Sequence, residues 1–426
     1  MNTEFSRFGD RLCKGSGIEE LMRDLGDALT TGGPDIKMLG GGQPAHIPEV
    51  DALWRQRFQE IMDDGDSFER MVGNYDPPKG NPHFIKALAK MLSENFGWDV
   101  TEKNIAITSG GQTAFFFLFN ALAGRMSDGR RKKILLPIVP EYIGYSSQSV
   151  GEDFFKAYKP IIEEIGDHQF KYRVDFDALE ITDDIAAICV SRPTNPTGNV
   201  LTDNETRRLA ELAEKHNIPF IIDNAYGAPF PNIFFADANP MWNENVILTL
   251  SLSKIGLPGT RTGIVVASEE IASAVASMSA IVGLANNNTG QALMLPLMES
   301  GEILKLSNDV VKPYYLEKSK QAQGWISDYF NEDTPYRYHV SEGALFLWLW
   351  FKDLPISSQE LYEKLKAKGV LIVSGHYFFF GLEEEWQHTQ ECIRVTYTMP
   401  EDKVRDGIKI IAEVVEEVYA AKAVDV

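Results

Sequence analysis

The 426-residue sequence has little cysteine and no long apolar run. Its three cysteines, Cys13, Cys189 and Cys392, lie far apart, without a CxxC pair or the spacing of a zinc site. This pattern excludes a disulfide framework and indicates a reducing compartment. No stretch reaches the ~20 apolar residues that span a bilayer, and the N-terminus lacks the apolar segment of a secretory signal. These absences predict a cytoplasmic protein without a membrane segment.

Basic residues are also scarce. The sequence has 41 Lys and Arg against 61 Asp and Glu, which gives a formal net charge of −20. A nucleic-acid or anionic-membrane partner needs a clustered basic surface, so we expect neither. The seven histidines form no metal-binding pattern, and no metal is predicted. A few well-placed Lys and Arg can still bind anionic small molecules in a buried site.

Short apolar runs alternate with longer amphipathic segments in the middle of the chain, which is typical of a mostly parallel sheet covered by helices. The final third mixes strands and helices differently, so we expect a smaller α+β domain after about residue 300. Predicted strands are 105–108, 133–136, 186–190, 219–222, 246–250, 263–267, 342–350, 370–373 and 392–398. Predicted helices are 17–29, 113–122, 205–216, 359–368 and 402–421.

Polar residues follow the predicted strands of the middle region, where ligands of open α/β sheets bind. After the first strand, Gly110, Gly111 and Gln112 open a helix whose free N–H groups suit a phosphate. Tyr142 follows the second strand, where an aromatic ring either stacks on a flat cofactor or packs the loop. Asn195 lies in a Pro/Gly turn after the third strand, placed to donate to a cofactor oxygen.

Charged residues follow the later strands. Asp223 comes directly after an apolar strand, where a carboxylate is costly without a cationic partner such as a pyridinium N–H. Lys254 follows the next strand, with Ser251 and Ser253 before it and Arg261 after it. Each of these residues alone has a structural explanation, since a lysine can extend to the surface. Together, the amine, carboxylate, aromatic ring and phosphate loop match pyridoxal phosphate held as a Schiff base on Lys254.

The ordered set of motifs resembles the fold-type I pyridoxal-phosphate aminotransferases of the aspartate aminotransferase superfamily over most of the chain. Besides the strand-end residues, the matching segments are 40–44 (GGGQP), 74–80 and 392–397 (CIRVTY). The resemblance implies a large α/β domain at residues 46–310, with a mostly parallel seven-stranded sheet flanked by helices. It also implies a small α+β domain built from residues 1–45 and 311–426.

The resemblance further implies a role for each site residue. Lys254, Asp223 and Tyr226 are catalytic: Lys254 moves the proton at the substrate Cα, and Asp223 pairs with the ring nitrogen. Tyr226 and Asn195 hydrogen-bond the cofactor 3-oxygen, and Tyr142 stacks on the ring. The residues implied for the phosphate region are Gly110, Gly111, Gln112, Ser251, Ser253 and Arg261.

Substrate and subunit contacts follow from the same resemblance. Arg394 binds the substrate α-carboxylate through two parallel hydrogen bonds, with Asn195 and the backbone of Gly42 beside it. Tyr75 reaches the phosphate of the neighbouring subunit, so the active unit is a homodimer. One departure is that Arg261 follows Lys254 by seven residues, one fewer than is usual in the family.

The expected substrate is a small neutral amino acid. Family members that use dicarboxylic amino acids place an arginine near residues 280–290, but here none occurs between Arg261 and Arg337. Segments 39–49 and 250–263 resemble members that exchange an amino group between valine and pyruvate, giving 2-oxoisovalerate and alanine. The alternatives are a pyridoxal-phosphate-dependent C–S β-lyase, an aminotransferase for another neutral or aromatic amino acid, and a non-catalytic aminotransferase-like regulatory protein. The regulator is disfavoured because no helix-turn-helix precedes the first motif.

Overall fold

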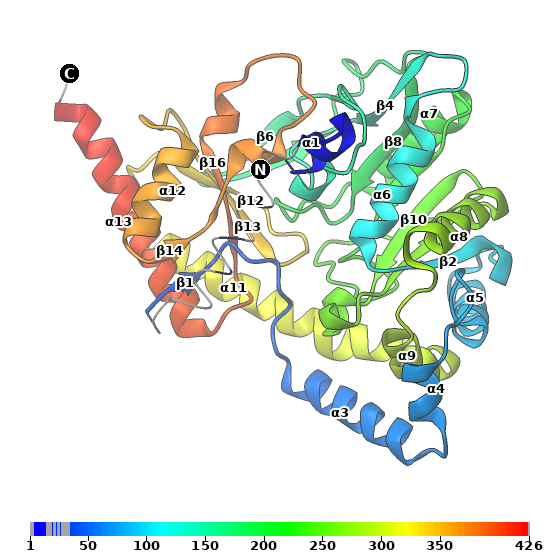
Figure 1. The fold of residues 1–426 in the computed structure, drawn as a ribbon. Helices are drawn as coiled ribbons and strands as arrows, with labels where there is room; N and C mark the ends of the chain where they lie inside the picture. The colour runs from blue at the N-terminus through cyan, green and yellow to red at the C-terminus, as the bar shows by residue number, and fades with distance from the viewer. Residues whose placement is uncertain (1–3, 14–18, 20–22, 24–25, 27–34, 425–426) are drawn as a thin grey trace.

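Two β-sheets organise the computed structural model, which describes residues 4–13, 19, 23, 26 and 35–424. In Figure 1 the first sheet lies to the right, with α6 (Gly111–Leu122) and α8 (Glu269–Gly283), and the second lies to the left, beside α12 (Ser358–Ala367) and α13 (Glu401–Val424). The helix predicted at 17–29 lies outside the described residues except for positions 19, 23 and 26. No helix in those ranges is long and apolar enough to cross a membrane.

The first sheet has eight strands in the order β2-β11-β10-β9-β8-β4-β3, with β5 also paired to β4. Neighbours from β10 through β9, β8 and β4 to β5 run parallel, whereas β11 is antiparallel to both of its neighbours. The predicted mostly parallel sheet is therefore confirmed, with the two-residue β3 as an eighth strand. The bounds are β2 Ile105–Thr108, β3 Gly124–Arg125, β4 Arg131–Leu136, β5 Phe155–Ala157, β8 Ile185–Ser191, β9 Phe220–Asp223, β10 Val246–Ser251 and β11 Gly263–Val266.

Helices cover this sheet because its strands are apolar on both faces. Every residue of β8 and β10 is buried, and five residues of α6, including Phe115 and Phe119, are buried as well. A capping box formed by Thr202 and Glu205 begins α7. The helices on this side are α3 Pro48–Asp63, α4 Ser67–Gly73, α5 Pro82–Phe96, α6 Gly111–Leu122, α7 Asp203–Lys215, α8 Glu269–Gly283, α9 Thr289–Ser300 and α10 Glu302–Lys305.

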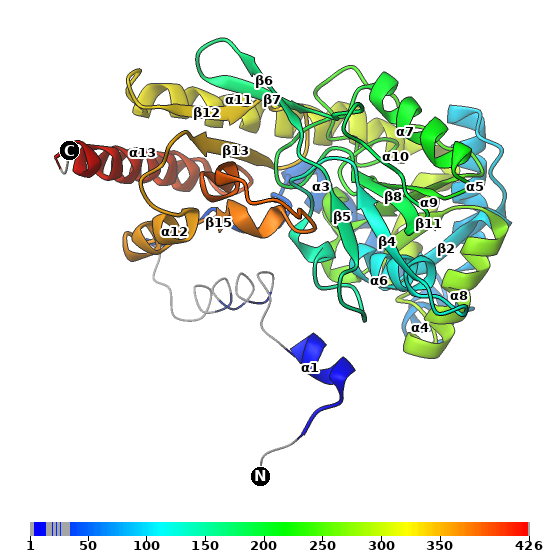
Figure 2. The same cartoon turned by 90° about the horizontal axis from the view of Figure 1, so that it is seen from above.

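The second sheet has six strands in the order β15-β16-β13-β12-β7-β6. Figure 2 shows α11, α12 and α13 gathered around it. The strands are β6 Ile161–Ile165, β7 Gln169–Arg173, β12 Tyr336–His339, β13 Phe346–Phe351, β15 Val373–Ser374 and β16 Cys392–Thr396. The helices are α11 Lys312–Tyr329, α12 Ser358–Ala367 and α13 Glu401–Val424.

Segments distant in sequence join this second sheet and its surroundings. The hairpin β6–β7 comes from residues placed by prediction in the large domain, and it joins the sheet because β7 pairs in parallel with β12. Near the N-terminus, β1 (Lys37–Met38) pairs with β14 (Val370–Leu371), which ties that segment to the C-terminal third. The domain limits 46–310, and 1–45 with 311–426, stay a prediction.

One predicted strand begins later than expected. The segment 342–350 contains β13, but the strand starts only at Phe346. Gly343 packs so closely that a Cβ there would lie 2.5 Å from the carbonyl oxygen of Ile233, and Ala344 has a φ of 61°. Ala344 therefore has a left-handed backbone conformation, which an extended strand does not contain, so β13 cannot start before this residue.

Candidate active site

A cavity of about 740 Å³ lies at the carboxyl ends of β8, β9 and β10 and takes part of its wall from β16. Such a volume is typical of a small-molecule site. Of the predicted site residues, Gly110 directly precedes the lining, and Tyr75 lies outside it with an exposed fraction of 81%. The others line it: Gly42, Gly111, Gln112, Tyr142, Asn195, Asp223, Tyr226, Ser251, Ser253, Lys254, Arg261 and Arg394.

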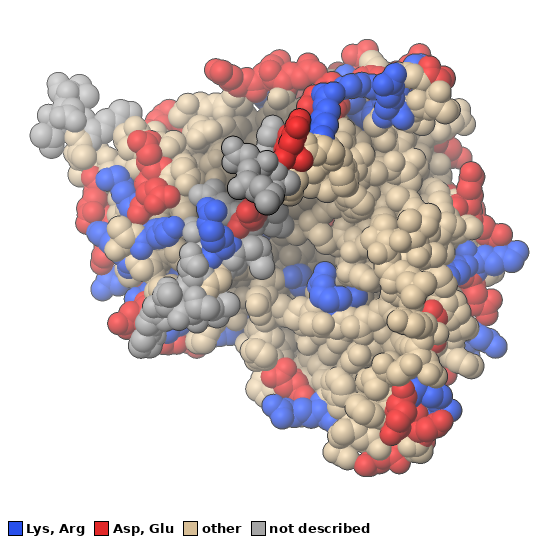
Figure 3. Space-filling view, viewed as in Figure 1, with Lys and Arg blue, Asp and Glu red and all other residues tan. Residues whose placement is uncertain are grey.

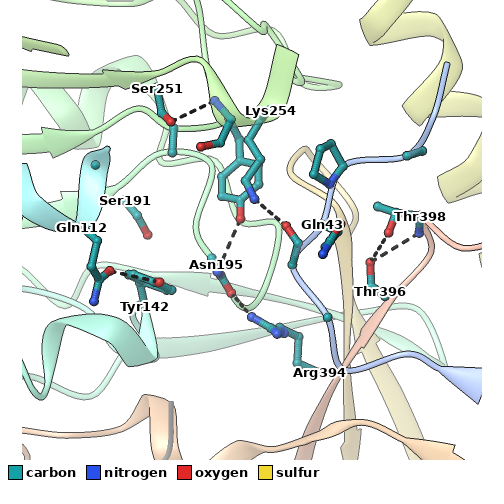
Figure 4. Close-up of a pocket in the computed structure, with 18 of the residues that line it drawn as sticks. Gln43, Gln112, Tyr142, Ser191, Asn195, Ser251, Lys254, Arg394, Thr396 and Thr398 are labelled. Carbon is teal, nitrogen blue, oxygen red and sulfur yellow. Dashed lines mark hydrogen bonds between the residues drawn. The ribbon is translucent and has the colours of Figure 1, made fainter. Parts of the chain in front are cut away.

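Lys254 follows β10 in a short 3₁₀ turn and extends into the cavity (Figure 4). Its Nζ donates to the carbonyl oxygen of Gly42 at 2.5 Å and lies 5.3 Å from the centre of the Tyr226 ring. Burial in the cavity wall, together with the positive charges of Arg394 and Arg261, lowers the pKa of Lys254 to about 8. A substantial fraction of the amine is therefore neutral, and nucleophilic, near physiological pH.

Asp223 ends β9, and its carboxylate is held by three donors. Tyr145 donates its hydroxyl to Oδ2 at 2.5 Å, while the backbone N–H of Ala225 and the hydroxyl of Thr249 reach Oδ1 at 3.1 and 3.4 Å. Burial raises the pKa of Asp223, and these hydrogen bonds, together with the charge of Lys254, oppose the rise. A half-buried carboxylate with oriented oxygens is a suitable acceptor for a cationic N–H.

Arg394 reaches the cavity from β16 and is fixed on two sides. Its Nη1 donates to Oδ1 of Asn195 and its Nη2 to the carbonyl oxygen of Gly40, both at 2.7 Å. The guanidinium lies 4.2 Å from the centre of the Phe346 ring, and Asn195 in turn donates to the Tyr226 hydroxyl at 3.5 Å. Among the described residues, nothing pairs with the buried Nε of Arg394. Burial lowers the pKa of Arg394 to about 10, so it remains a cation at neutral pH.

The other end of the cavity is suited to a phosphate. Gly111 begins α6, so the backbone N–H groups of Gly111 and Gln112 have no partner within the helix. Gly110 has a φ of 92°, and a Cβ there would lie 2.2 Å from Nη2 of Arg261. Despite the shorter loop, Arg261 therefore lies against the glycine turn, with Ser251 and Ser253 lining the same cavity. Helix N–H groups, hydroxyls and a guanidinium together bind phosphate dianions.

Tyr142 presents its ring to the cavity because of a glycine next to it. A Cβ on Gly144 would lie 2.3 Å from the Tyr142 ring, so that position needs glycine. The Tyr142 hydroxyl donates to Oε1 of Gln112 at 3.2 Å. Burial raises the pKa of Tyr142 to about 12, which keeps the phenol neutral. A neutral ring at this position is available for stacking.

Several lining residues were missed from the sequence. Ser191 ends β8 and directly follows the predicted strand 186–190, so the search for polar residues after strands, which found Asp223, would have found it too. Thr249 lies inside the predicted strand 246–250, so that search does not reach it. Thr396 and Thr398 also line the cavity and hydrogen-bond each other at 3.1 Å. Within the described ranges, no group of three or more His, Cys, Asp and Glu side chains is placed to hold a metal ion.

Comparison with known proteins places this site in a family. The family model described as aminotransferase class I and II matches residues 51–411. The chain belongs to the class I and II aminotransferases. The predicted family, fold class and transaminase reaction type are confirmed.

This aminotransferase has full-length relatives. It is 48% identical over 416 residues to the valine–pyruvate aminotransferase of Escherichia coli (strain K12), covering 98% of this chain and 99% of the relative. A crystal structure of a putative amino-acid aminotransferase from Psychrobacter arcticum 273-4 superimposes with a TM-score of 0.95 at 46% identity, covering 98% and 100% of the two chains. That of valine-pyruvate aminotransferase from Salmonella typhimurium LT2 gives 0.87 at 46% identity, covering 95% and 99%.

Proposed function

We propose that this aminotransferase binds pyridoxal phosphate on Lys254 and transfers the amino group between valine and pyruvate, giving 2-oxoisovalerate and alanine. The observation that carries the proposal is one cavity that contains the half-buried amine of Lys254, the half-buried carboxylate of Asp223 and the buried guanidinium of Arg394. The relatives named as valine–pyruvate aminotransferases support the choice of substrates.

The residues of the cavity fit this cofactor. When bound, pyridoxal phosphate supplies an aldehyde that condenses with amines and a pyridinium ring that accepts electrons from the substrate Cα. Lys254 would hold the aldehyde carbon, Asp223 the ring N–H, and Asn195 and Tyr226 the 3-oxygen. The first turn of α6 and Arg261 would hold the phosphate.

The chain's own groups then account for binding and proton movement. Arg394, which lines the cavity, binds the α-carboxylate of the amino acid. Asn195 fixes the guanidinium through Oδ1, so the carboxylate and Cα are oriented together. Lys254 would take the proton from the substrate Cα and return it. Its pKa of about 8 suits both directions of that transfer.

A small neutral side chain is favoured because the sequence has no arginine from residue 262 to 336 to pair with a second carboxylate. Another neutral or aromatic amino acid would use the same Arg394 and Lys254. A C–S β-lyase would also share them, because proton removal at Cα is common to both reactions. Only the products of the reaction distinguish these alternatives.

We also propose a homodimer in which Tyr75 reaches the phosphate of the neighbouring subunit. Tyr75 has an exposed fraction of 81%, and Ile281, Val282 and Leu284 have 85%, 65% and 59%. Figure 3 shows a broad area with few charged side chains on the part of the surface around α6. Exposed apolar side chains of this kind mark association surfaces.

The free thiol of Cys13, which is exposed, supports the predicted cytoplasmic location.

The proposal is tested by the visible absorbance of the purified protein loaded with pyridoxal phosphate. Valine or alanine should remove the absorbance band of the lysine-bound cofactor, and pyruvate or 2-oxoisovalerate should restore it. Lys254→Ala should lose this band and the activity, whereas Lys215→Ala, on the surface of α7, should keep both. A wild type without the band would contradict cofactor binding. Ammonia and pyruvate released from a β-substituted amino acid, without a need for a 2-oxo acid, would favour the lyase.

Arg394→Lys tests the substrate assignment. A lysine cannot make two parallel hydrogen bonds to a carboxylate, so the KM for valine should rise by about 100-fold. The absorbance band should stay, because Arg394 is assigned to the substrate. An unchanged KM for valine would contradict the assignment of Arg394.

A further inference from the structure

Tyr145 contacts both side chains proposed to hold the cofactor ring. Its hydroxyl donates to Oδ2 of Asp223 at 2.5 Å. Its ring lies edge-on to that of Tyr142, with centroids 5.3 Å apart and planes at 90°. Tyr145 itself has an exposed fraction of 0% and lies behind the cavity wall. One buried residue thus connects the carboxylate proposed to hold the ring nitrogen with the aromatic side chain proposed to stack on the ring.

The position of Tyr145 is fixed by its packing. Two rings of α6 enclose it: the centroid of Phe115 lies 4.7 Å away, and that of Phe119 lies 5.3 Å away at 81°. Its backbone N–H donates to the carbonyl oxygen of Tyr142 at 3.0 Å. Because the ring cannot rotate towards water, the hydroxyl depends on Asp223 for its hydrogen bond. A buried, unpaired hydroxyl would be costly.

Asp223 depends on Tyr145 in return. Of the three groups that donate to its carboxylate, Tyr145 makes the shortest hydrogen bond and the only one to Oδ2 among the described residues. Burial raises the pKa of Asp223, and the Tyr145 hydroxyl is the largest of the effects that oppose the rise. Removing this donor would leave Oδ2 without a partner and the carboxylate free to rotate about its last bond.

We propose that Tyr145 is a positioning residue of this aminotransferase, whose hydroxyl fixes the Asp223 carboxylate against the ring nitrogen of the cofactor. This inference rests on the proposed function. Tyr145 touches neither substrate nor cofactor, and it acts through Asp223. Its loss should therefore weaken electron withdrawal by the ring, which sets kcat, and leave the contact between Arg394 and the substrate carboxylate unchanged.

Tyr145→Phe removes the hydroxyl and keeps the ring packing. We expect kcat to fall about tenfold or more, as for a lost hydrogen bond to a charged group, with the KM for valine changed by less than about twofold. The ¹⁵N chemical shift of ring-labelled pyridoxal phosphate should move towards that of the unprotonated ring. With a cofactor analogue that has a carbon in place of the ring nitrogen, wild type and Tyr145→Phe should have equal rates.

Tyr158→Phe is the matched control. Tyr158 also hydrogen-bonds through its hydroxyl, to the carbonyl oxygen of Glu180 at 3.1 Å, and does not line the cavity. Its loss should leave the ¹⁵N shift and kcat unchanged. If Tyr145→Phe does not fold, 3-fluorotyrosine at position 145 retains the hydroxyl as a stronger donor and should move the ¹⁵N shift in the opposite direction.

The outcomes separate this inference from the proposed function. A wild type that binds no pyridoxal phosphate overturns both together. A wild type that binds it normally, with the ¹⁵N shift of Tyr145→Phe or of the fluorotyrosine protein unchanged, overturns the role of Tyr145 alone. Equal losses of kcat in Tyr145→Phe with the natural cofactor and with the carbon analogue would also overturn it, because the effect would then be independent of the ring nitrogen.

Discussion

Glu141 is a buried carboxyl group that stands next to the site without lining it. Its Oε1 accepts the backbone N–H of Ser191 at 2.8 Å, and its Oε2 pairs with the Ser191 hydroxyl at 2.5 Å. Burial raises the pKa of Glu141 to about 8, and the negative charge of Asp223 contributes to the rise. At neutral pH Glu141 is therefore mostly protonated.

Glu141→Gln should change how stability depends on pH. Because the pKa of Glu141 is raised on folding, its stabilising contribution is full below about pH 4.5 and is lost as the pH rises towards about 8. Glutamine does not titrate, so the free energy of unfolding of wild type relative to Glu141→Gln should fall between pH 5 and 8. The slope can reach about 1.4 kcal/mol per pH unit. Urea unfolding of the cofactor-free proteins measures it.

Glu384→Gln provides a control at a carboxyl group whose pKa is lowered rather than raised. The hydrogen bond and charge of Lys159 lower the pKa of Glu384, so its contribution is lost only as the pH falls below about 4.5. Between pH 5 and 8, the difference between wild type and Glu384→Gln should therefore be constant. A constant difference for Glu141→Gln as well would show that Glu141 is ionised throughout that range.

At the scale of elements, a buried ion pair joins the β6–β7 hairpin to the loop that carries Asn195. Lys171 on β7 pairs with Glu342, and its Nζ also donates to Oδ1 of Asn199 and to the carbonyl oxygen of Val200, both at 3.1 Å. Glu342 accepts the backbone N–H of Val200 at 3.0 Å. The pair thus connects three segments: β7, the loop after β8 and the turn before β13.

Lys171→Met should be strongly destabilising, because it leaves the Glu342 carboxylate buried without its cation. A loss of about 3 kcal/mol in the free energy of unfolding is expected, and Lys171→Met with Glu342→Leu should recover part of it. Lys133→Met, which breaks a more exposed pair with Asp153, should cost less than about 1 kcal/mol. Urea unfolding measures all three, and equal losses in the two single variants would contradict a structural role for the pair.

The β6–β7 hairpin is a part of the fold that could not be predicted from the sequence. Six of the eight strands of the first sheet could be predicted within two residues because they are mostly apolar runs, whereas the short strands β3 and β5 were not predicted. The site could be predicted because parallel strands bring their carboxyl ends to one edge. By contrast, β6 is mostly exposed and its neighbour β7 pairs with β12, so no local pattern assigns the hairpin to the second sheet. The hydrogen bond from Tyr145 to Asp223, 78 residues apart, also depends on the folded structure.

At the scale of the whole molecule, the proposed dimer should depend on the exposed apolar residues at the C-terminal end of α8. Ile281→Glu places a charge on a side chain that is 85% exposed here and would be buried in the dimer. This variant should sediment as a monomer at concentrations where wild type is a dimer. Ile161→Glu, at a residue of β6 that is 50% exposed, is the matched control and should remain dimeric. A dimeric Ile281→Glu would place the interface elsewhere.

Mixing two variants tests whether each site takes residues from both subunits. Lys254→Ala should be inactive, and Tyr75→Ala should be nearly inactive at limiting cofactor because a donor to the phosphate is lost. In a mixed dimer, the Lys254 of one chain meets the Tyr75 of the other, which restores one intact site of the two. Random exchange makes half of the dimers mixed, so activity should recover to about a quarter of wild type. If Tyr75 served the site of its own chain, every site would lack Lys254 or Tyr75 and nothing would be recovered.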